Sequence, residues 1–225
     1  MKHKQIFISG IDTDCGKTYI TGLLAYHIRK TGVNCITSKL VQTGCTGIAD
    51  DIIEHRRIME MGLLPEDENG ITCPFVYSFP ASPHLSSEID QRPFEIEKVS
   101  EMFSSLQQKY ELVLLEGAGG LAVPLTNRIL SSEYLKENKL PLVLVSSSKL
   151  GSINHTLLSI DYCMNNNIEL KTVVYNQFPD DNKKIANSSY EFLKEFITQN
   201  HPELKFIHSN DLQKNSVFKL ANLML

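Results

Sequence analysis

The stretch GIDTDCGKT, residues 10–18, decides the fold because it joins a predicted strand to a predicted helix. Residues 5–9 (QIFIS) suit a buried strand, and apolar residues recur at helical spacing from Lys17 onward. A strand, a turn and a helix form the setting of a phosphate-binding loop, since amides at a helix N-terminus attract anions. The usual loop has four residues between its glycines, but five separate Gly10 from Gly16 here. We predict a phosphate loop with an altered entry, over the alternative of a simple strand-to-helix turn.

Strand-like and helix-like segments alternate along the rest of the chain. Unbroken apolar runs of this length are typical of strands buried on both faces, as in parallel sheets. The predicted strands are residues 5–9, 33–40, 112–116, 142–146 and 172–175, and Lys205–His208. The predicted helices are Lys17–Lys30 and residues 96–110, 153–166 and 185–199. The alternation predicts an α/β fold: a doubly wound, mostly parallel sheet with helices on both faces, like that of P-loop NTPases.

Residues 64–93 interrupt this alternation. Five prolines lie in the stretch, so we predict mostly loop with one edge strand. Long loops inside a compact domain are usually functional or disordered. The chain shows no internal repeat and no low-complexity linker, and we expect residues 1–225 to form a single domain.

Composition excludes several classes of protein. The formal net charge is −4 and no Lys/Arg-rich run is present, which gives no reason to expect nucleic acid as a partner. No apolar stretch reaches membrane-spanning length, so we expect no membrane partner and a cytoplasmic location. The apolar end, residues 215–225, is predicted to pack on the body, with membrane attachment as the alternative. Five cysteines without a Cys-x-x-Cys pair argue against a disulfide framework or a zinc site; Cys35 and Cys163 suit buried thiols.

Charged residues at the predicted carboxyl ends of strands are the candidates for chemistry. Lys17 would reach the terminal phosphates of a nucleotide, and the Thr18 hydroxyl would bind magnesium. Glu116 ends an apolar run just before a glycine-rich stretch, where it supplies a second magnesium ligand. Lys39 ends another strand, so we expect it at the same edge of the sheet. Each residue alone suits a solvated strand end, but together they favour a site for an anionic reacting group.

Four segments together resemble the dethiobiotin synthetase family. They are GIDTDCGKT at residues 10–18, SPH at 82–84, EGAGG at 116–120 and KLGSINHT at 149–156. The resemblance runs from the first strand to about Asn176, and the extra residue in the phosphate loop is one of the family's traits. It implies an enzyme that uses ATP and Mg²⁺ to close a cyclic urea on 7,8-diaminopelargonate with CO₂. The implied intermediates are a carbamate and a carbamic-phosphoric mixed anhydride.

The resemblance also implies roles for individual residues. Lys17 and Lys39 would be catalytic, and Thr18, Asp51 and Glu116 would hold the metal, with Asp51 favoured over Asp50 on spacing alone. Asn176 would read the adenine edge, with Gln177 beside it. The implied ATP-binding residues are Thr13, Asp14, Cys15, Gly16, Lys17, Thr18, Tyr19, Asp51, Glu116, Gly117, Ala118, Gly119, Asn176 and Gln177.

A shared substrate site follows from the same resemblance. The implied substrate-binding residues are Lys39, Thr43, Gly151, Ser152, Ile153 and Asn154. The last four would begin a helix whose amides bind the substrate carboxylate in the other subunit of a homodimer, with Ser152 as the capping residue. The chain departs from the family at Leu40, where proline is usual, and at Asp14, where glutamate is frequent; both departures affect affinity rather than the reaction.

Two other functions are compatible with this fold. Nucleotide-driven switches of the partitioning or division-site type carry a lysine five positions before the loop lysine, where this chain has Asp12. A small-molecule kinase would leave a phosphorylated product rather than free phosphate. The lack of the early lysine favours the synthetase over the switch.

Overall fold

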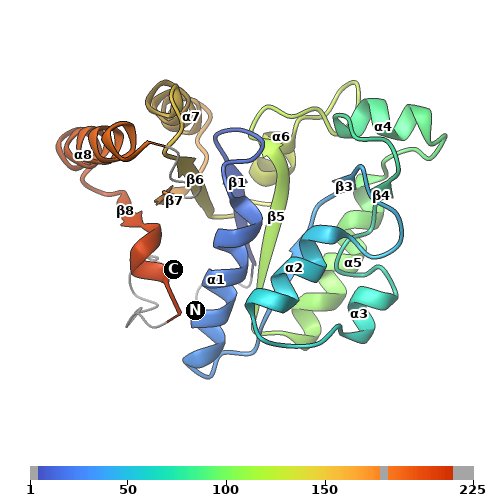
Figure 1. The fold of residues 1–225 in the computed structure, drawn as a ribbon. Coiled ribbons are helices and arrows are strands. Elements are labelled where there is room, and N and C mark those ends of the chain that lie inside the picture. Colours follow the sequence, from blue (N-terminus) through green and yellow to red (C-terminus); the bar gives the residue numbers. More distant parts are fainter. Residues whose placement is uncertain (1–4, 178–181, 215–225) are drawn as a thin grey trace.

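The architecture is a six-stranded sheet, seen in a computed structural model that describes residues 5–177 and 182–214. The strand order is β2-β5-β1-β6-β7-β8, and every strand pair among the described residues is parallel. The strands are β1 (Gln5–Gly10), β2 (Cys35–Lys39), β5 (Leu112–Gly120), β6 (Leu142–Ser147), β7 (Leu170–Asn176) and β8 (Lys205–His208). Helices pack around this sheet (Figure 1), so the predicted parallel α/β fold is confirmed.

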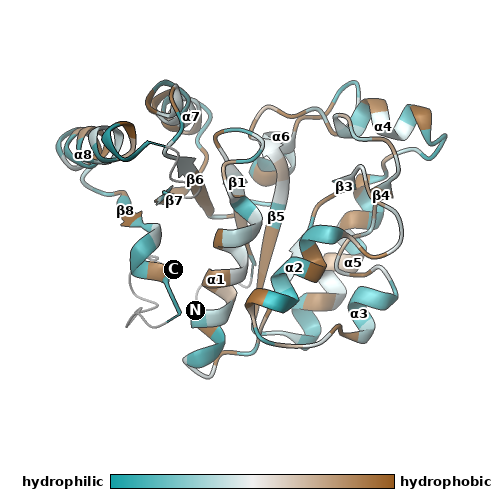
Figure 2. Cartoon of the chain, viewed as in Figure 1, coloured by the Kyte–Doolittle hydropathy of each residue, from teal (hydrophilic) through white to brown (hydrophobic). Residues whose placement is uncertain are grey.

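Alternation along β1 explains why both faces of the sheet are covered. Phe7 lies in one buried apolar cluster and Ile8 in another, because successive side chains point to opposite faces. Leu24 of α1 shares the cluster of Ile8, whereas Val99 of α5 and Ile160 of α7 share the cluster of Phe7. In Figure 2, β5 is brown over much of its length while α7 and α8 are part teal, as expected for surface helices. The helices are α1 (Lys17–Lys30), α2 (Asp50–Ile58), α3 (Pro65–Glu68), α4 (Pro83–Ile89), α5 (Ile96–Lys109), α6 (Ser131–Glu137), α7 (Ser152–Asn165) and α8 (Lys183–Asn200).

The bounds of α1 and β8 match the prediction, but β5 is longer than expected. We predicted that this strand ends at Glu116, and that prediction is wrong. β5 continues to Gly120, which pairs with Gly10 after a register shift between the pairs Ile8–Glu116 and Gly10–Gly120. Glycine has no side chain to hinder the close approach, so the glycine-rich stretch stays paired instead of leaving the sheet as a turn.

The proline-rich stretch contains more structure than the prediction allowed. Helix α4 begins with Pro83 at its first helical position, where the missing amide proton costs nothing. The predicted edge strand is instead β4 (Val76–Tyr77), which pairs with β3 (Gln42–Thr43) in a separate two-stranded parallel sheet. Thr43, one of the implied substrate-binding residues, therefore lies in a short strand. The prolines correctly indicated an interruption of the strand–helix alternation, but one of them, Pro83, begins a helix that was not predicted.

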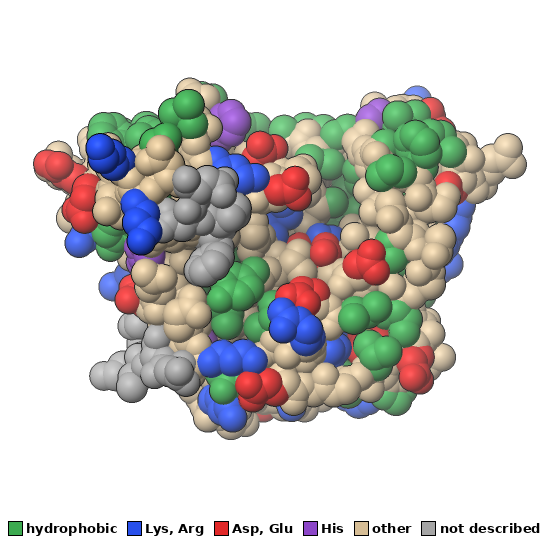
Figure 3. Space-filling model, viewed as in Figure 1, with side chains coloured by type: hydrophobic (Ala, Val, Ile, Leu, Met, Phe, Trp, Pro, Cys, Tyr) green, Lys and Arg blue, Asp and Glu red, His purple; other side chains and the backbone are tan. Residues whose placement is uncertain are grey.

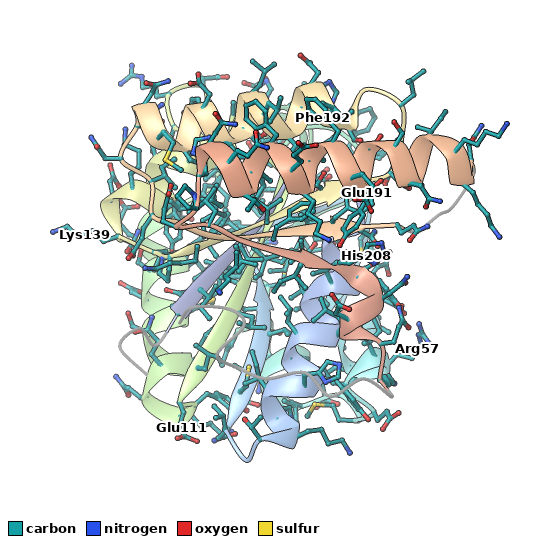
Figure 4. The ribbon with its side chains drawn as sticks, turned by 90° about the vertical axis from the view of Figure 1, so that its left-hand side faces the viewer. Arg57, Glu111, Lys139, Glu191, Phe192 and His208 are labelled. Atoms are coloured by element: carbon teal, nitrogen blue, oxygen red, sulfur yellow. The ribbon has the colours of Figure 1, made fainter. Side chains whose placement is uncertain are left out.

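Seen from the side, α8 lies across one flank of the molecule and carries Glu191 and Phe192 (Figure 4). Among residues 5–177 and 182–214, no helix combines the length and apolar character needed to cross a membrane. The predicted packing of residues 215–225 falls outside the described part of the chain.

Candidate active site

The predicted phosphate loop is the turn between β1 and α1. Gly16 has φ 91°, and a Cβ there would lie 2.0 Å from Asn176 Nδ2, so only glycine suits this position. Asn176 Nδ2 donates to the carbonyl of Cys15 at 2.9 Å, which ties the end of β7 to the loop. Lys17 Nζ donates to the carbonyl of Asp12 at 2.9 Å. Among the described residues no side chain caps α1, and its first turn has no acidic residue, so this helix start suits an anion.

Two carboxylates, a hydroxyl and an ammonium group meet beside this loop. Thr18 Oγ1 lies 3.0 Å from Asp51 Oδ1 and 3.1 Å from Glu116 Oε1. Lys39 Nζ donates to Glu116 Oε1 at 2.7 Å and forms an ion pair with Asp51. Lys39 and Glu116 are directly paired across β2 and β5, which is why their side chains reach the same place. Asp50, the alternative to Asp51, is exposed.

Burial and charge set the ionisation of the central pair. Burial alone would raise the pKa of Glu116, but the Lys39 charge and the His55 hydrogen bond outweigh it and hold the pKa well below its ordinary value. Burial alone would lower the pKa of Lys39, but the Glu116 and Asp51 carboxylates raise it above its ordinary value. Lys39 therefore stays an ammonium ion and Glu116 a carboxylate at neutral pH.

Most of the predicted site residues surround one cavity of about 940 Å³. Lys17 and Lys39 both line it, although they come from different parts of the sheet edge. Figure 3 shows a hollow between the surface over α7 and α8 and the surface over α4, with acidic and basic side chains in it. The predicted residues that line the cavity are Thr13, Asp14, Gly16, Lys17, Thr18, Tyr19, Lys39, Thr43, Asp51, Glu116, Ala118, Gly119 and Asn176.

Other predicted residues lie away from this cavity. Cys15 belongs to the loop but its side chain is buried, and only its carbonyl is used here, as the acceptor from Asn176. A Cβ on Gly117 would lie 2.8 Å from the Phe7 ring, so Gly117 packs against the core. The backbone N–H of Gln177 donates to Ser209 Oγ at 3.2 Å. The segment Gly151, Ser152, Ile153 and Asn154 does not line the cavity of its own chain.

The expected cap of α7 is wrong. Gly151, not Ser152, occupies the position before the helix and has φ 93°. Ser152 is the first helical residue, and its buried Oγ has no hydrogen-bond partner among the described residues. A left-handed Gly151 turns the chain into the helix, so a side-chain cap is not needed to set its start.

Several residues around the cavity escaped the sequence analysis. Val41, Gln42, Pro80, Ala81, Ser82 and Val123 also line it. Only Ser82 carried a signal, through the SPH segment. His55 is fully buried and its Nε2 lies 2.7 Å from Glu116 Oε2. Its position four residues after Asp51 on α2 could have indicated that both face the site.

The donor set fits a magnesium ion. Thr18, Asp51 and Glu116 offer one hydroxyl and two carboxylates, the hard oxygen ligands that Mg²⁺ prefers. Within the described ranges, no cluster of three or more His, Cys, Asp or Glu side chains has a metal-binding arrangement. Mg²⁺ is usually held by one or two protein carboxylates together with substrate phosphates.

Comparison with known proteins gives consistent matches. Residues 4–205 match a protein family described as an AAA domain. The chain is 48% identical over 204 residues to ATP-dependent dethiobiotin synthetase BioD 2 of Haemophilus ducreyi, covering 91% of this chain and 97% of that protein. It is 46% identical over 193 residues to ATP-dependent dethiobiotin synthetase BioD of Chlorobaculum tepidum, covering 86% of this chain and 81% of that protein.

A solved structure matches in fold. The structure of pNOB8 ParA bound to nonspecific DNA aligns with a TM-score of 0.53 over 98% of this chain and 90% of that chain. Sequence identity in the alignment is 10%, so the likeness shows the shared fold alone.

Proposed function

The chain belongs to the ATP-dependent dethiobiotin synthetase family, and on that premise we propose that it closes a cyclic urea on 7,8-diaminopelargonate with CO₂ and ATP. One observation carries the proposal. Lys17 and Lys39, on separate segments of the chain, line one cavity together with Thr18, Asp51 and Glu116. An anionic carbamate and a triphosphate repel one another, and two cationic groups that line the same cavity would offset that repulsion.

The reaction has three steps. One amine of the substrate attacks CO₂ and loses a proton, which gives a carbamate. A carbamate oxygen then accepts the γ-phosphoryl group of ATP, forming the mixed anhydride and releasing ADP. The second amine attacks the activated carbon, closes the five-membered ring and expels phosphate. Charge neutralisation and positioning are the protein's contribution, as in other phosphoryl transfers.

Lys17 and Lys39 would act at different ends of this reaction. Lys17 starts α1 and would release the Asp12 carbonyl to bind the transferred phosphoryl group. Lys39 stands beside Glu116 and would bind the carbamate. Thr18, Asp51 and Glu116 would hold magnesium, which when bound neutralises charge on the triphosphate.

Gly151, Ser152, Ile153 and Asn154 would serve the substrate carboxylate in a second copy of the chain. Two features support this part of the proposal: they lie outside their own chain's cavity, and they form the N-terminal turn of α7. The enzyme would then be a homodimer, and we expect it to work in the cytoplasm.

Two experiments test the shared site. Sedimentation would measure whether the molar mass in solution is that of two chains. Mixing a Lys39→Ala chain with a Ser152→Asp chain should restore about a quarter to half of the activity if sites are shared; no recovery contradicts sharing.

A phosphate-release assay tests the reaction. With ATP, diaminopelargonate and bicarbonate present, we expect free phosphate and dethiobiotin in equal amounts, and neither when the diamine or bicarbonate is omitted. Lys39→Ala should lower the rate on the order of a hundredfold to a thousandfold while ATP still binds. Phosphate release without the diamine would point to a nucleotide switch, and a phosphorylated diamine to a kinase; either result contradicts the proposal.

A further inference from the structure

The two oxygens of the Glu116 carboxylate have separate partners. Oε1 faces the cavity and accepts from Lys39 Nζ at 2.7 Å and Thr18 Oγ1 at 3.1 Å. Oε2 faces the interior and pairs with His55 Nε2 at 2.7 Å. Glu116 and His55 are both fully buried, so their contact is made away from bulk solvent. Because His55 occupies Oε2, Oε1 is the Glu116 oxygen that faces the other groups of the cavity.

Helix α2 supplies two polar groups to the site from adjacent turns. Asp51 and His55 are four residues apart, and this spacing places both on the same side of the helix. Asp51 contacts Thr18 and Lys39, and His55 contacts Glu116. Helix α2 thus places Asp51 at the cavity and His55 against the side of Glu116 that is turned away from Lys39 and Thr18.

The two residues that follow His55 on α2 have their partners away from the cavity. Arg57 lies at the surface (Figure 4) and pairs with the exposed side of Glu54. Arg56 is buried but points to Asp67 and Thr37, away from the carboxylates of the cavity. His55 has no second polar anchor, because its Nδ1 has no hydrogen-bond partner among the described residues. The contact with Glu116 is therefore the one hydrogen bond of the His55 ring among the described residues.

We propose that His55 is a positioning residue: it holds Oε2 of Glu116 and so presents Oε1 to the magnesium ion bound with ATP. The inference rests on the proposed binding of Mg²⁺ and ATP at this cavity. Partners that orient a metal ligand from behind typically change metal affinity 10–100-fold when they are removed. No proton transfer by His55 is needed for this role.

Three variants separate positioning from packing. His55→Gln keeps an N–H donor at about the reach of Nε2, whereas His55→Asn has the same amide on a side chain one methylene shorter. His55→Leu fills the volume without a donor and serves as a second loss variant if the Asn protein is too unstable to purify. Asp67→Asn is the matched control, since it weakens a different buried contact of α2, the one with Arg56.

Two quantities are measured for each protein. Isothermal titration calorimetry gives the Mg²⁺ requirement with ATP present, and thermal unfolding gives the midpoint temperature. We expect the Asn and Leu variants to need about 10–100-fold more Mg²⁺, and the Gln variant to recover most of that loss. Asp67→Asn should lower the unfolding midpoint without changing the Mg²⁺ requirement.

Three results would overturn the inference: an unchanged Mg²⁺ requirement in the folded Asn or Leu variant, a Gln variant as impaired as these two, or an equal shift in Asp67→Asn. Failure of the proposed function looks different. A protein that binds Mg²⁺ and ATP in this His55-dependent manner but forms no dethiobiotin would contradict the reaction and support the positioning role.

Discussion

Replacing Arg56 with methionine should destabilise the protein without removing any group from the cavity. Arg56 is 2% exposed and Asp67 3% exposed, and two hydrogen bonds of 2.7 and 2.8 Å join them. Arg56 Nη1 also donates to Thr37 Oγ1 at 2.6 Å, which links α2 to β2. The Lys39 amide donates to the Thr72 carbonyl at 2.7 Å, so the same network supports the strand that carries Lys39.

The expected loss can be worked from these contacts. Removing one partner of a buried ion pair typically costs about 3–5 kcal/mol because the other charge is left without compensation. Asp67 would keep its donors from the Leu64 amide at 2.9 Å and the Thr72 hydroxyl at 2.8 Å, so we expect the lower end of that range. For a chain of this size, a loss of about 3 kcal/mol lowers the unfolding midpoint by roughly 6–12 °C.

The loss should also depend on pH. Burial would raise the pKa of Asp67, but the Arg56 hydrogen bonds and charge outweigh it and hold the pKa below its ordinary value of 3.8. In the parent protein this carboxylate therefore adds stability above pH 3.8, which is lost as pH falls through the lower folded pKa. Without Arg56, only the Leu64 and Thr72 hydrogen bonds oppose burial, so the pKa of Asp67 in the folded variant lies above its pKa in the folded parent. Protonation of Asp67 then relieves part of the variant's loss of stability. The deficit should shrink as pH falls below about 5.

Urea unfolding at pH 8 and pH 4.5 measures the difference between the two proteins directly. Arg57→Met is the matched control, because Arg57 is the next residue on α2 and its ion pair with Glu54 lies at the surface (Figure 4). That control should unfold like the parent at both pH values. A deficit below about 1 kcal/mol at pH 8, or one that grows toward pH 4.5, would refute the reasoning.

Three further predictions concern the cavity. Asp51→Asn should raise the Mg²⁺ concentration needed for turnover about 10–100-fold, whereas Asp50→Asn should leave it unchanged; equal effects in a Mg²⁺ titration would contradict the assignment. Gly16→Ala should abolish ATP binding measured by calorimetry, because its Cβ would meet Asn176 Nδ2 at 2.0 Å; ordinary affinity would show that the loop can shift. Thr18→Val should weaken Mg²⁺-dependent but not Mg²⁺-free nucleotide binding, and a uniform loss would argue against a metal ligand.

Short-range patterns predicted the elements whose ends have local causes. Helix α1 begins after Gly16 and ends just before Gly32, both with positive φ, and its bounds match the prediction. β5 was predicted too short because its end depends on pairing with Gly10, which no local pattern reports. Helix α4 was not predicted, because a proline indicates a loop as readily as the first position of a helix, where Pro83 lies.

The sequence by itself determined the fold class and the phosphate loop, since apolar periodicity and the glycine positions at a helix start are properties of neighbouring residues. Which charges meet was decided only by the tertiary structure. Thr18 and Glu116 are 98 positions apart, and His55 and Glu116 are 61 positions apart. They come together because β5 lies between β2 and β1, an order set by the packing of the whole sheet. The loop could therefore be predicted from its own residues, whereas the contact of His55 with Glu116 could not.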